Sequence, residues 1–309
     1  SNAAIKYVED KQTGVKEKEH FKKLKIKTGD EIEDLANIMS EMENDIAFFE
    51  KDLKKAIKEK ERISTELNLA SKIQASRLPN VFPAFPKIDE FDIYATMHPA
   101  KEVGGDFYDY SMIDEDHLGF VVADVSGKGV PACLFMMEAK IYISNYLLMG
   151  FSPAKTLELA NKRMCENNEA DLFVTVWLGI LELSTGKIIS ANGGHDYPAL
   201  CRKNSEFEIV EDKHGMILGC MEDAKYFDTE IQLEKGDKLF IYTDGVPEAA
   251  KENREMLGIN NMLALLNRCK NLPPKEIVEN MKRLVDEFVE GVEQFDDITM
   301  LTVVYNGKK

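Results

Sequence analysis

Aspartates recur in this 309-residue sequence at points where an apolar stretch meets a glycine-rich turn. Asp106 lies in VGGDFYD, Asp124 ends an apolar stretch and enters VSGKG, and Asp244 follows LFIYT and precedes a glycine. A fourth site, Asp296-Asp297, precedes the last apolar stretch. A carboxylate at the end of a strand lies at the rim of a core, and a neighbouring glycine lets the backbone approach a ligand closely. These aspartates are therefore candidates for ligand binding.

The chemistry that such a set would perform depends on cations. One aspartate beside a glycine after a strand is usually only a turn. Four such sites in one chain are harder to explain as turns, because carboxylates brought together repel strongly unless cations neutralise them. Oxygen ligands without histidine or cysteine partners at metal spacing favour Mg²⁺ or Mn²⁺ over Zn²⁺. The sequence therefore predicts an aspartate-rich site for hard divalent cations.

Strands and helices must position these aspartates. Alternating or continuous apolar runs predict strands at residues 91–97, 118–122, 173–183, 187–192, 239–242 and 298–305. Helical stretches are expected at about 130–149, 153–168, 259–269 and 274–290. Strands in runs, with helices in pairs between them, indicate an α+β layered domain with mostly antiparallel sheets.

A different pattern precedes this region. From Asp30 onward a seam of residues repeats at alternating spacings of four and three: Leu35, Met39, Met42, Ile46, Phe49, Leu53, Ala56, Lys60, Ile63, Leu67, Ala70 and Gln74. The seam predicts a parallel coiled coil, with a long amphipathic helix packed on its own domain as the alternative. Polar Lys60 and Gln74 would weaken the seam locally or set its register. Leu78-Pro79 predicts the end of the helix, because proline disfavours the helical region for the residue before it.

Composition restricts the compartment and the partners. The net charge of −16 argues against nucleic acid as a partner, because phosphate backbones are bound by basic surfaces. The five scattered cysteines lack CxxC spacing, which excludes a thiolate zinc site and fits a reducing, cytoplasmic location. No secretory or membrane-spanning segment is visible. Ser1-Asn2-Ala3 looks like the remnant of a cleaved tag, so a membrane anchor is expected only if a missing upstream segment supplies it.

Five separated segments resemble the SpoIIE-like branch of the PPM (type 2C) protein phosphatases in order and spacing. They are VGGDFYD, ADVSGKGVPA, FVTVWLGILELSTGKIISANGGH, GDKLFIYTDGVPEA and DDITMLTVV, and the resemblance covers about residues 64–305. Upstream, TGDEI followed by Leu35 and Met42 resembles the second half of a HAMP module, with Glu33 where that module usually has glycine. The predicted organisation is a partial HAMP-like signalling segment at 1–50, a coiled-coil linker helix at 51–78 and a phosphatase domain at 79–309.

The resemblance implies two stacked antiparallel β-sheets flanked by helix pairs, with two Mn²⁺ or Mg²⁺ ions held between the sheets. Asp106 and Asp124 would be ligands, with Asp124 bridging both ions and the Val125 carbonyl contributing at one. Asp244 and Asp296 would complete the other site. The catalytic residues would be Asp106, Asp124 and Asp244. Asp297 would orient the loop, and Asp109 would reach a metal only through water.

The function implied is a metal-dependent serine/threonine protein phosphatase. Two cations ~4 Å apart clamp a phosphate and activate a shared water for attack, so no phosphoenzyme forms. Lys101 would contact the phosphate, or it is a rim lysine in solvent. The family resemblance implies a small regulatory substrate, often a STAS-domain anti-sigma-factor antagonist in a partner-switching pathway.

Regulation and two rival functions follow from the same sequence. The seam from Leu35 to Ala70 is expected to dimerise the chain and to transmit a signal to the metal site, with the helix at 131–148 as the candidate element to be moved. The rivals are a catalytically silent phosphoprotein-binding scaffold and a coiled-coil signalling adaptor. His195-Asp196 suggests an HD-type phosphohydrolase, but the further histidines that such a site needs are absent, so His195 is interpreted as structural.

Overall fold

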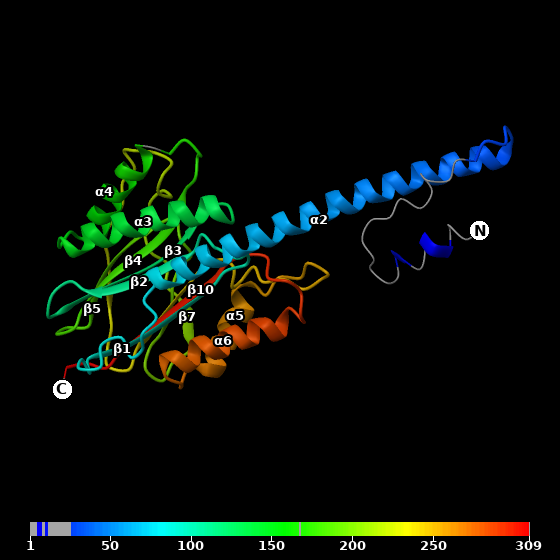
Figure 1. The fold of residues 1–309 in the computed structure, drawn as a ribbon. Coiled ribbons are helices and arrows are strands. Elements are labelled where there is room, and N and C mark those ends of the chain that lie inside the picture. The colour runs from blue at the N-terminus through cyan, green and yellow to red at the C-terminus, as the bar shows by residue number, and fades with distance from the viewer. Residues whose placement is uncertain (1–4, 8–9, 12–25, 167, 309) are drawn as a thin grey trace. The chain divides into compact units, whose positions relative to one another are not determined.

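The structure, a computed structural model, describes residues 5–7, 10–11, 26–166 and 168–308 (Figure 1). The chain divides into two compact units, Ser1–Leu67 and Asn68–Lys309. Part of the predicted HAMP-like segment lies outside the described residues. The predicted division into segments 1–50, 51–78 and 79–309 remains a prediction. Helix α2 (Glu31–Arg77) runs across the first predicted boundary, at residue 50, and across residue 67, where the first compact unit ends. Within the described residues, no helix is long and apolar enough to cross a membrane.

Helix α2 begins with a side-chain cap. The carboxylate of Asp30 accepts a hydrogen bond from the backbone N–H of Ile32 at 3.1 Å, which satisfies one of the free donors of the first turn. Glu33 reaches back and accepts from the N–H of Gly29 at 2.8 Å. This reciprocal arrangement resembles a capping box. Glu33, the departure from the HAMP-like pattern, therefore helps to start the helix.

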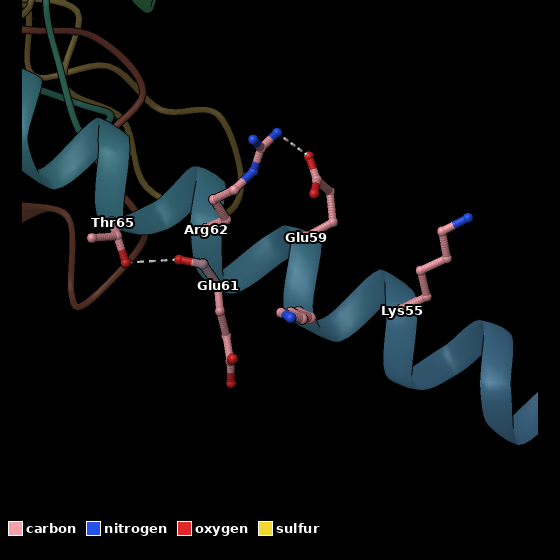
Figure 2. Close-up of a pocket in the computed structure, with 6 residues that line it drawn as sticks. Lys55, Glu59, Glu61, Arg62 and Thr65 are labelled. Carbon is pink, nitrogen blue, oxygen red and sulfur yellow. Dashed lines mark hydrogen bonds and ion pairs between the residues drawn. The ribbon is translucent and has the colours of Figure 1, made fainter.

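In the first unit, the heptad seam of α2 is exposed. Leu35, Met42, Phe49, Leu53 and Ile63 are between 46% and 68% exposed. Figure 2 shows charged side chains between residues 55 and 65, where Arg62 pairs with Glu59 at 2.6 Å. An apolar stripe flanked by charges on one helix is the pattern of a helix that pairs with another helix.

Two five-stranded antiparallel sheets form the second unit. In order across the first sheet lie β1 (Phe91–His98), β10 (Ile298–Tyr305), β9 (Lys238–Tyr242), β6 (Ala199–Cys201) and β7 (Phe207–Ile209). In order across the second lie β2 (Phe107–Met112), β3 (His117–Val125), β4 (Val174–Glu182), β5 (Lys187–Gly193) and β8 (Thr229–Gln232). The predicted two-sheet architecture is thus confirmed.

Helix pairs cover the two sheets on opposite sides (Figure 1). Helices α3 (Val130–Leu148) and α4 (Pro153–Cys165) pack on the second sheet, and α5 (Gly258–Cys269) and α6 (Pro274–Phe288) pack on the first. Every residue of β10 is buried, because one face of this strand meets the other sheet and the opposite face meets a helix. A strand buried on both faces reads as a continuous apolar run, which is why the sequence pattern predicts it well.

The sequence pattern misses four strands. Strands β6 and β7 have three residues each and β8 has four, too few for a periodic signal. Strand β2 mixes polar and aromatic residues, with Asp109 at its middle. Helix α4 also ends at Cys165, earlier than the expected residue 168.

Candidate active site

The loop before β2 carries the first motif, and its two glycines are required by close packing. A Cβ on Gly104 would lie 2.2 Å from Oδ2 of Asp297, and a Cβ on Gly105 would lie 2.7 Å from the carbonyl oxygen of Val125. Only glycine allows the backbone to approach so closely. The two motifs that contain Val125 and Asp297 therefore meet at this loop.

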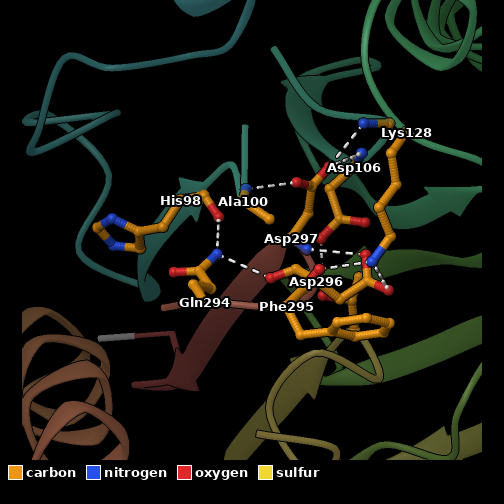
Figure 3. A network of polar contacts seen from close by, with 10 residues as sticks. His98, Ala100, Asp106, Lys128, Gln294, Phe295, Asp296 and Asp297 are labelled. Carbon is orange, nitrogen blue, oxygen red and sulfur yellow. Dashed lines mark hydrogen bonds and ion pairs between the residues drawn. The ribbon is translucent and has the colours of Figure 1, made fainter. Parts of the chain in front are cut away.

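Asp297 holds the loop by backbone hydrogen bonds. Its buried carboxylate accepts from the N–H groups of Ala100 at 2.7 Å, Gly105 at 2.6 Å and Asp106 at 3.3 Å. Figure 3 shows the bond from Ala100, with Asp106 and Asp296 close by. A carboxylate that accepts several N–H donors fixes their positions firmly, because each bond is charge-assisted. Asp297 thus orients the segment that carries Asp106.

Asp106 is buried and 1% exposed, and it is tied to the first sheet. The hydroxyl of Thr243, just after β9, donates to Oδ2 of Asp106 at 2.7 Å. The same hydroxyl oxygen accepts from the N–H of Thr299 in β10 at 2.9 Å. This chain of bonds places the Asp106 carboxylate beside the ends of two central strands of the first sheet.

The remaining aspartates lie where strands end. Asp124 is near the end of β3, Asp244 follows β9, and Asp296 lies shortly before β10; all three are partly buried. A Cβ on Gly245 would lie only 1.9 Å from the carbonyl oxygen of Asp297, so the turn after Asp244 packs on the Asp296-Asp297 segment. The structure thus brings the four aspartate motifs together.

A lysine partly compensates the negative charge. Nζ of Lys128, in the loop after β3, lies 2.9 Å from Oδ2 of Asp296 and 3.7 Å from the centre of the Phe295 ring. The side-chain amide of Gln294 donates to the carbonyl of His98 at 2.7 Å and to that of Asp296 at 2.8 Å (Figure 3). These contacts fix the segment before β10 next to the loop after β3.

Burial and mutual repulsion make these carboxyl groups weaker acids than usual. Burial, followed by the charges of Asp124 and Asp297, raises the pKa of Asp106 well above its ordinary value. Burial and the charges of Asp296 and Asp297 raise the pKa of Asp124 to about 6. Burial, and then the charge of Asp124, raise the pKa of Asp244 to about 7. Bound cations would remove this cost of ionisation.

Of the other residues singled out from the sequence, Lys101 is exposed, and Asp109 and His195 are held by their own partners. Lys101 is exposed in the loop after β1. The Asp109 carboxylate is bound by Nζ of Lys140 at 2.6 Å and by the hydroxyl of Ser144 at 2.7 Å, both on α3. His195 is buried, with Nδ1 2.8 Å from the hydroxyl of Thr175, and burial lowers its pKa to about 4. This neutral, enclosed histidine agrees with a structural role.

Two residues of the site were missed by the sequence analysis. Thr243 orients Asp106, and Lys128 pairs with Asp296. Both lie inside motifs that the sequence analysis identified, YTDG and VSGKG. Their residue types and positions do not indicate which distant carboxylate each of them contacts. Their partners lie 137 residues away for Thr243 and 168 for Lys128 (296 minus 128).

The site offers carboxylate and carbonyl oxygens as metal ligands and carries excess negative charge. Both properties suit hard divalent cations. Among the residues that the structure describes, no three carboxylate, imidazole or thiolate groups already converge closely enough to form a metal cage. The donor chemistry therefore fits Mg²⁺ or Mn²⁺, while cation binding would have to draw the carboxylates closer together.

Known proteins are similar to this chain in sequence. The family model of Stage II sporulation protein E (SpoIIE) matches residues 114–306. Phosphoserine phosphatase RsbU of Bacillus subtilis is 30% identical over 195 residues, which are 62% of this chain and 56% of that protein. Phosphoserine phosphatase RsbP of the same organism is 26% identical over 185 residues, which are 59% of this chain and 45% of that protein. The chain spans about half the length of these curated relatives.

Solved structures show the same fold. The SiaA-PP2C domain of Pseudomonas aeruginosa aligns with a TM-score of 0.71 at 24% identity, over 80% of this chain and 98% of that one. A SpoIIE structure from Bacillus subtilis, which includes the PP2C phosphatase domain and a fragment of the regulatory domain, aligns with a TM-score of 0.60 at 19% identity, over 71% and 64%. RsbX in complex with magnesium aligns with a TM-score of 0.54 at 18% identity, over 71% and 95%.

Proposed function

The chain belongs to the SpoIIE family and carries a domain with the PP2C phosphatase fold, and we propose that it is a metal-dependent serine/threonine protein phosphatase. Its substrate would be phosphoserine or phosphothreonine in a protein. The observation that carries this proposal is the meeting of four aspartate motifs at one buried, negatively charged place, where the pKa values of three aspartates are raised.

The residues that would hold two Mn²⁺ or Mg²⁺ ions are Asp106, Asp124, Asp244, Asp296 and the carbonyl of Val125. Supporting this set are its oxygen-only donors and the close approach of Gly105 to the Val125 carbonyl. When bound, the cations would supply the positive charge that clamps phosphate oxygens and makes water a better nucleophile. We infer that Asp106, Asp124 and Asp244 are the residues on which catalysis depends.

Neighbouring side chains would prepare the site before substrate arrives. The Thr243 hydroxyl donates to Oδ2 of Asp106 and so fixes the orientation of this proposed ligand. The Lys128 ammonium neutralises Asp296, whose charge would otherwise add to that of Asp124. Lys101 is exposed three residues before Gly104, and we propose that it contacts the substrate phosphate. A lysine binds phosphate as a compact point charge.

The substrate is proposed to be a small regulatory protein of a partner-switching pathway, of the STAS-domain anti-sigma-factor antagonist type. Supporting this are two relatives named as phosphoserine phosphatases, RsbU and RsbP. A further solved structure, with a TM-score of 0.61, contains the RsbU and RsbW domains of Rv1364c from Mycobacterium tuberculosis. The net charge of −16 fits a protein substrate rather than a nucleic acid.

Removing divalent cations tests the proposed function. We expect a phosphoserine peptide to be hydrolysed with Mn²⁺, activity to disappear with excess EDTA, and fresh Mn²⁺ to restore it, because bound cations would clamp the phosphate oxygens and activate water. Phosphate release measured by malachite green gives the rate. Hydrolysis that continues undiminished in EDTA would refute the metal-dependent mechanism.

The raised pKa values predict a pH-dependent affinity for Mn²⁺. Asp124, with a pKa of about 6, and Asp244, with a pKa of about 7, must lose their protons to bind a cation. Affinity should therefore fall as the pH is lowered from about 8 to about 5, as measured by calorimetric titration at constant ionic strength. Asp244→Asn should lose the part of this dependence near pH 7. An affinity that is constant over this range would contradict the proposed ligands.

The exposed seam of α2 supports a homodimer. Phe49 and Leu53 are 68% and 61% exposed at consecutive seam positions. The double substitution Phe49→Glu with Leu53→Glu should convert a dimer into a monomer in light scattering, because four carboxylates would meet in an apolar seam. Deleting residues 1–60 should likewise change oligomeric state or activity.

A matched control lies on the same helix. The substitutions Lys51→Met and Lys58→Met alter exposed positions outside the seam and change the net charge by the same amount. This variant should remain dimeric. If the seam variant also stayed dimeric, with unchanged activity, the seam would have no role in association or signalling.

A further inference from the structure

Gln74 is an exception on helix α2. Of the 47 residues of this helix, all of them described, Gln74 alone is fully buried, with 2% exposure. Buried glutamine is unusual, because its amide must find hydrogen-bond partners to offset the loss of water. Gln74 belongs to the second unit, so its neighbours there can be described.

The partners of Gln74 are the backbone groups of one glycine. Its Nε2 donates to the carbonyl of Gly104 at 2.7 Å, and its Oε1 accepts from the N–H of Gly104 at 3.1 Å. The side-chain amide thus pairs with both backbone groups of Gly104. Gly104 is buried, and within the described residues its backbone N–H and C=O have no other hydrogen-bond partner.

Gly104 begins the segment that carries Asp106. The Asp297 carboxylate accepts from the next two N–H groups, those of Gly105 and Asp106. Gly104 itself lies against Oδ2 of Asp297, with no room for a Cβ. The backbone leading to Asp106 is therefore held by two side chains, the amide of Gln74 and the carboxylate of Asp297.

The end of α2 is itself fixed on the second unit. Leu78, directly after the helix, is 7% exposed and belongs to the main core, and Ala70 packs against that core. The Tyr108 hydroxyl, in β2 two residues after Asp106, donates to the carbonyl of Pro79 at 2.7 Å. The last two turns of the helix thus have a defined position from which Gln74 reaches the loop.

We propose that Gln74 is a positioning residue that sets the backbone before Asp106, so that the affinity of the site for divalent cations depends on how the end of α2 is seated. The inference rests on the proposed function and assigns a second role to a residue of the heptad seam. Ala70 and Gln74 continue the phase of the exposed residues Leu35 to Ile63. A rotation of this helix about its axis would therefore turn Gln74 away from Gly104 together with the seam.

The test removes the hydrogen bonds of Gln74 and keeps its shape. Gln74→Met has nearly the same length and volume but leaves both backbone groups of Gly104 without a partner. Mn²⁺ binding to the full chain, measured by calorimetry without substrate, should weaken by about 10- to 100-fold, the range found when a residue supporting a metal ligand is lost. The rate at saturating Mn²⁺ should recover in large part, and KM for the phosphopeptide should stay unchanged.

Gln74→Glu is the second variant, and it serves if Gln74→Met does not fold. Glutamate accepts from the Gly104 N–H but cannot donate to the Gly104 carbonyl, so Mn²⁺ affinity should again fall. Two controls separate positioning from stability. Lys72→Met changes an exposed residue two positions earlier in α2, and Val278→Ala opens a cavity in the core under α6. The first should change nothing, and the second should lower Tm while Mn²⁺ affinity stays unchanged.

The outcomes separate this inference from the proposed function. A wild-type chain that binds no Mn²⁺ would overturn both. A wild-type chain that binds Mn²⁺ and hydrolyses the phosphopeptide, together with Gln74 variants of unchanged Mn²⁺ affinity, would overturn the positioning role alone. Weaker Mn²⁺ binding by folded Gln74→Met or Gln74→Glu, but not by Val278→Ala of equal or lower Tm, would establish it.

Discussion

Asp244→Asn should lower Mn²⁺-dependent phosphopeptide hydrolysis by more than about 100-fold, because loss of a proposed ligand should exceed the effect of losing an outer supporting residue. Asparagine keeps the size of the side chain but removes the charge that would attract a cation. The measurement is kcat/KM with Mn²⁺ in excess, compared with the Mn²⁺ affinity of the same variant. Full activity in Asp244→Asn would place the catalytic site elsewhere in the chain.

The same variant should not be less stable, and this separates catalysis from folding. Because burial and nearby carboxylates raise the pKa of Asp244 to about 7, the folded chain binds its proton more tightly than the unfolded chain. Ionised Asp244 therefore makes metal-free protein less stable as the pH rises from the ordinary carboxyl pKa through about 7. At about pH 8 the metal-free variant should melt at or above the wild-type temperature, and the difference should shrink toward pH 5.

Glu248→Gln provides a matched control for charge. Glu248 is exposed, lies four residues after Asp244, and its charge also raises the pKa of Asp244. Removing it subtracts one negative charge from the same region without removing a proposed ligand. Activity should change far less than in Asp244→Asn. Equal losses in the two variants would show that overall charge, and not a specific ligand, controls the reaction.

The sequence predicted well the elements whose residues carry a local signal. Strands β3, β4 and β10 are buried apolar runs, and turns with glycine mark their ends, so their existence followed from periodicity and turn chemistry. The aspartates were found because each follows or precedes such a run. The family resemblance then supplied the pairing of the two sheets, which periodicity alone does not give.

What the sequence could not predict depends on contacts between distant segments. Gln74 occupies a seam position, where a polar residue suggested a weak point of a coiled coil, yet in the structure it binds Gly104 thirty residues later. The threonine at position 243 directly follows a predicted strand, and its bond to Asp106 forms only when the end of β9 in the first sheet lies against the loop before β2 of the second sheet. Such roles are set by tertiary placement, so residue type and spacing do not encode them.

Asp297→Asn should destabilise the fold, whereas the neighbouring substitution Asp296→Asn should mainly weaken cation binding. The Asp297 carboxylate accepts hydrogen bonds from three backbone N–H groups of the segment 100–106. In asparagine the NH₂ group would replace one acceptor oxygen and would face these N–H donors without a hydrogen bond. We expect the free energy of unfolding to fall by about 3 kcal/mol, since hydrogen bonds to charged groups contribute about 1.5–3 kcal/mol each and asparagine retains one acceptor. Urea denaturation of metal-free protein gives this value.

Asp296 differs because its carboxylate pairs with Nζ of Lys128 at 2.9 Å and accepts from the N–H of the adjacent Asp297, whereas Asp297 binds the distant segment 100–106. Its side chain is 28% exposed, and an ion pair with a partly exposed lysine contributes little to stability. Asp296→Asn should therefore unfold near the wild-type urea midpoint while its Mn²⁺ affinity falls. The two adjacent aspartates would then separate support of the fold from cation binding, and a reversed pattern, with Asp296 essential for stability and Asp297 dispensable, would require their roles to be exchanged.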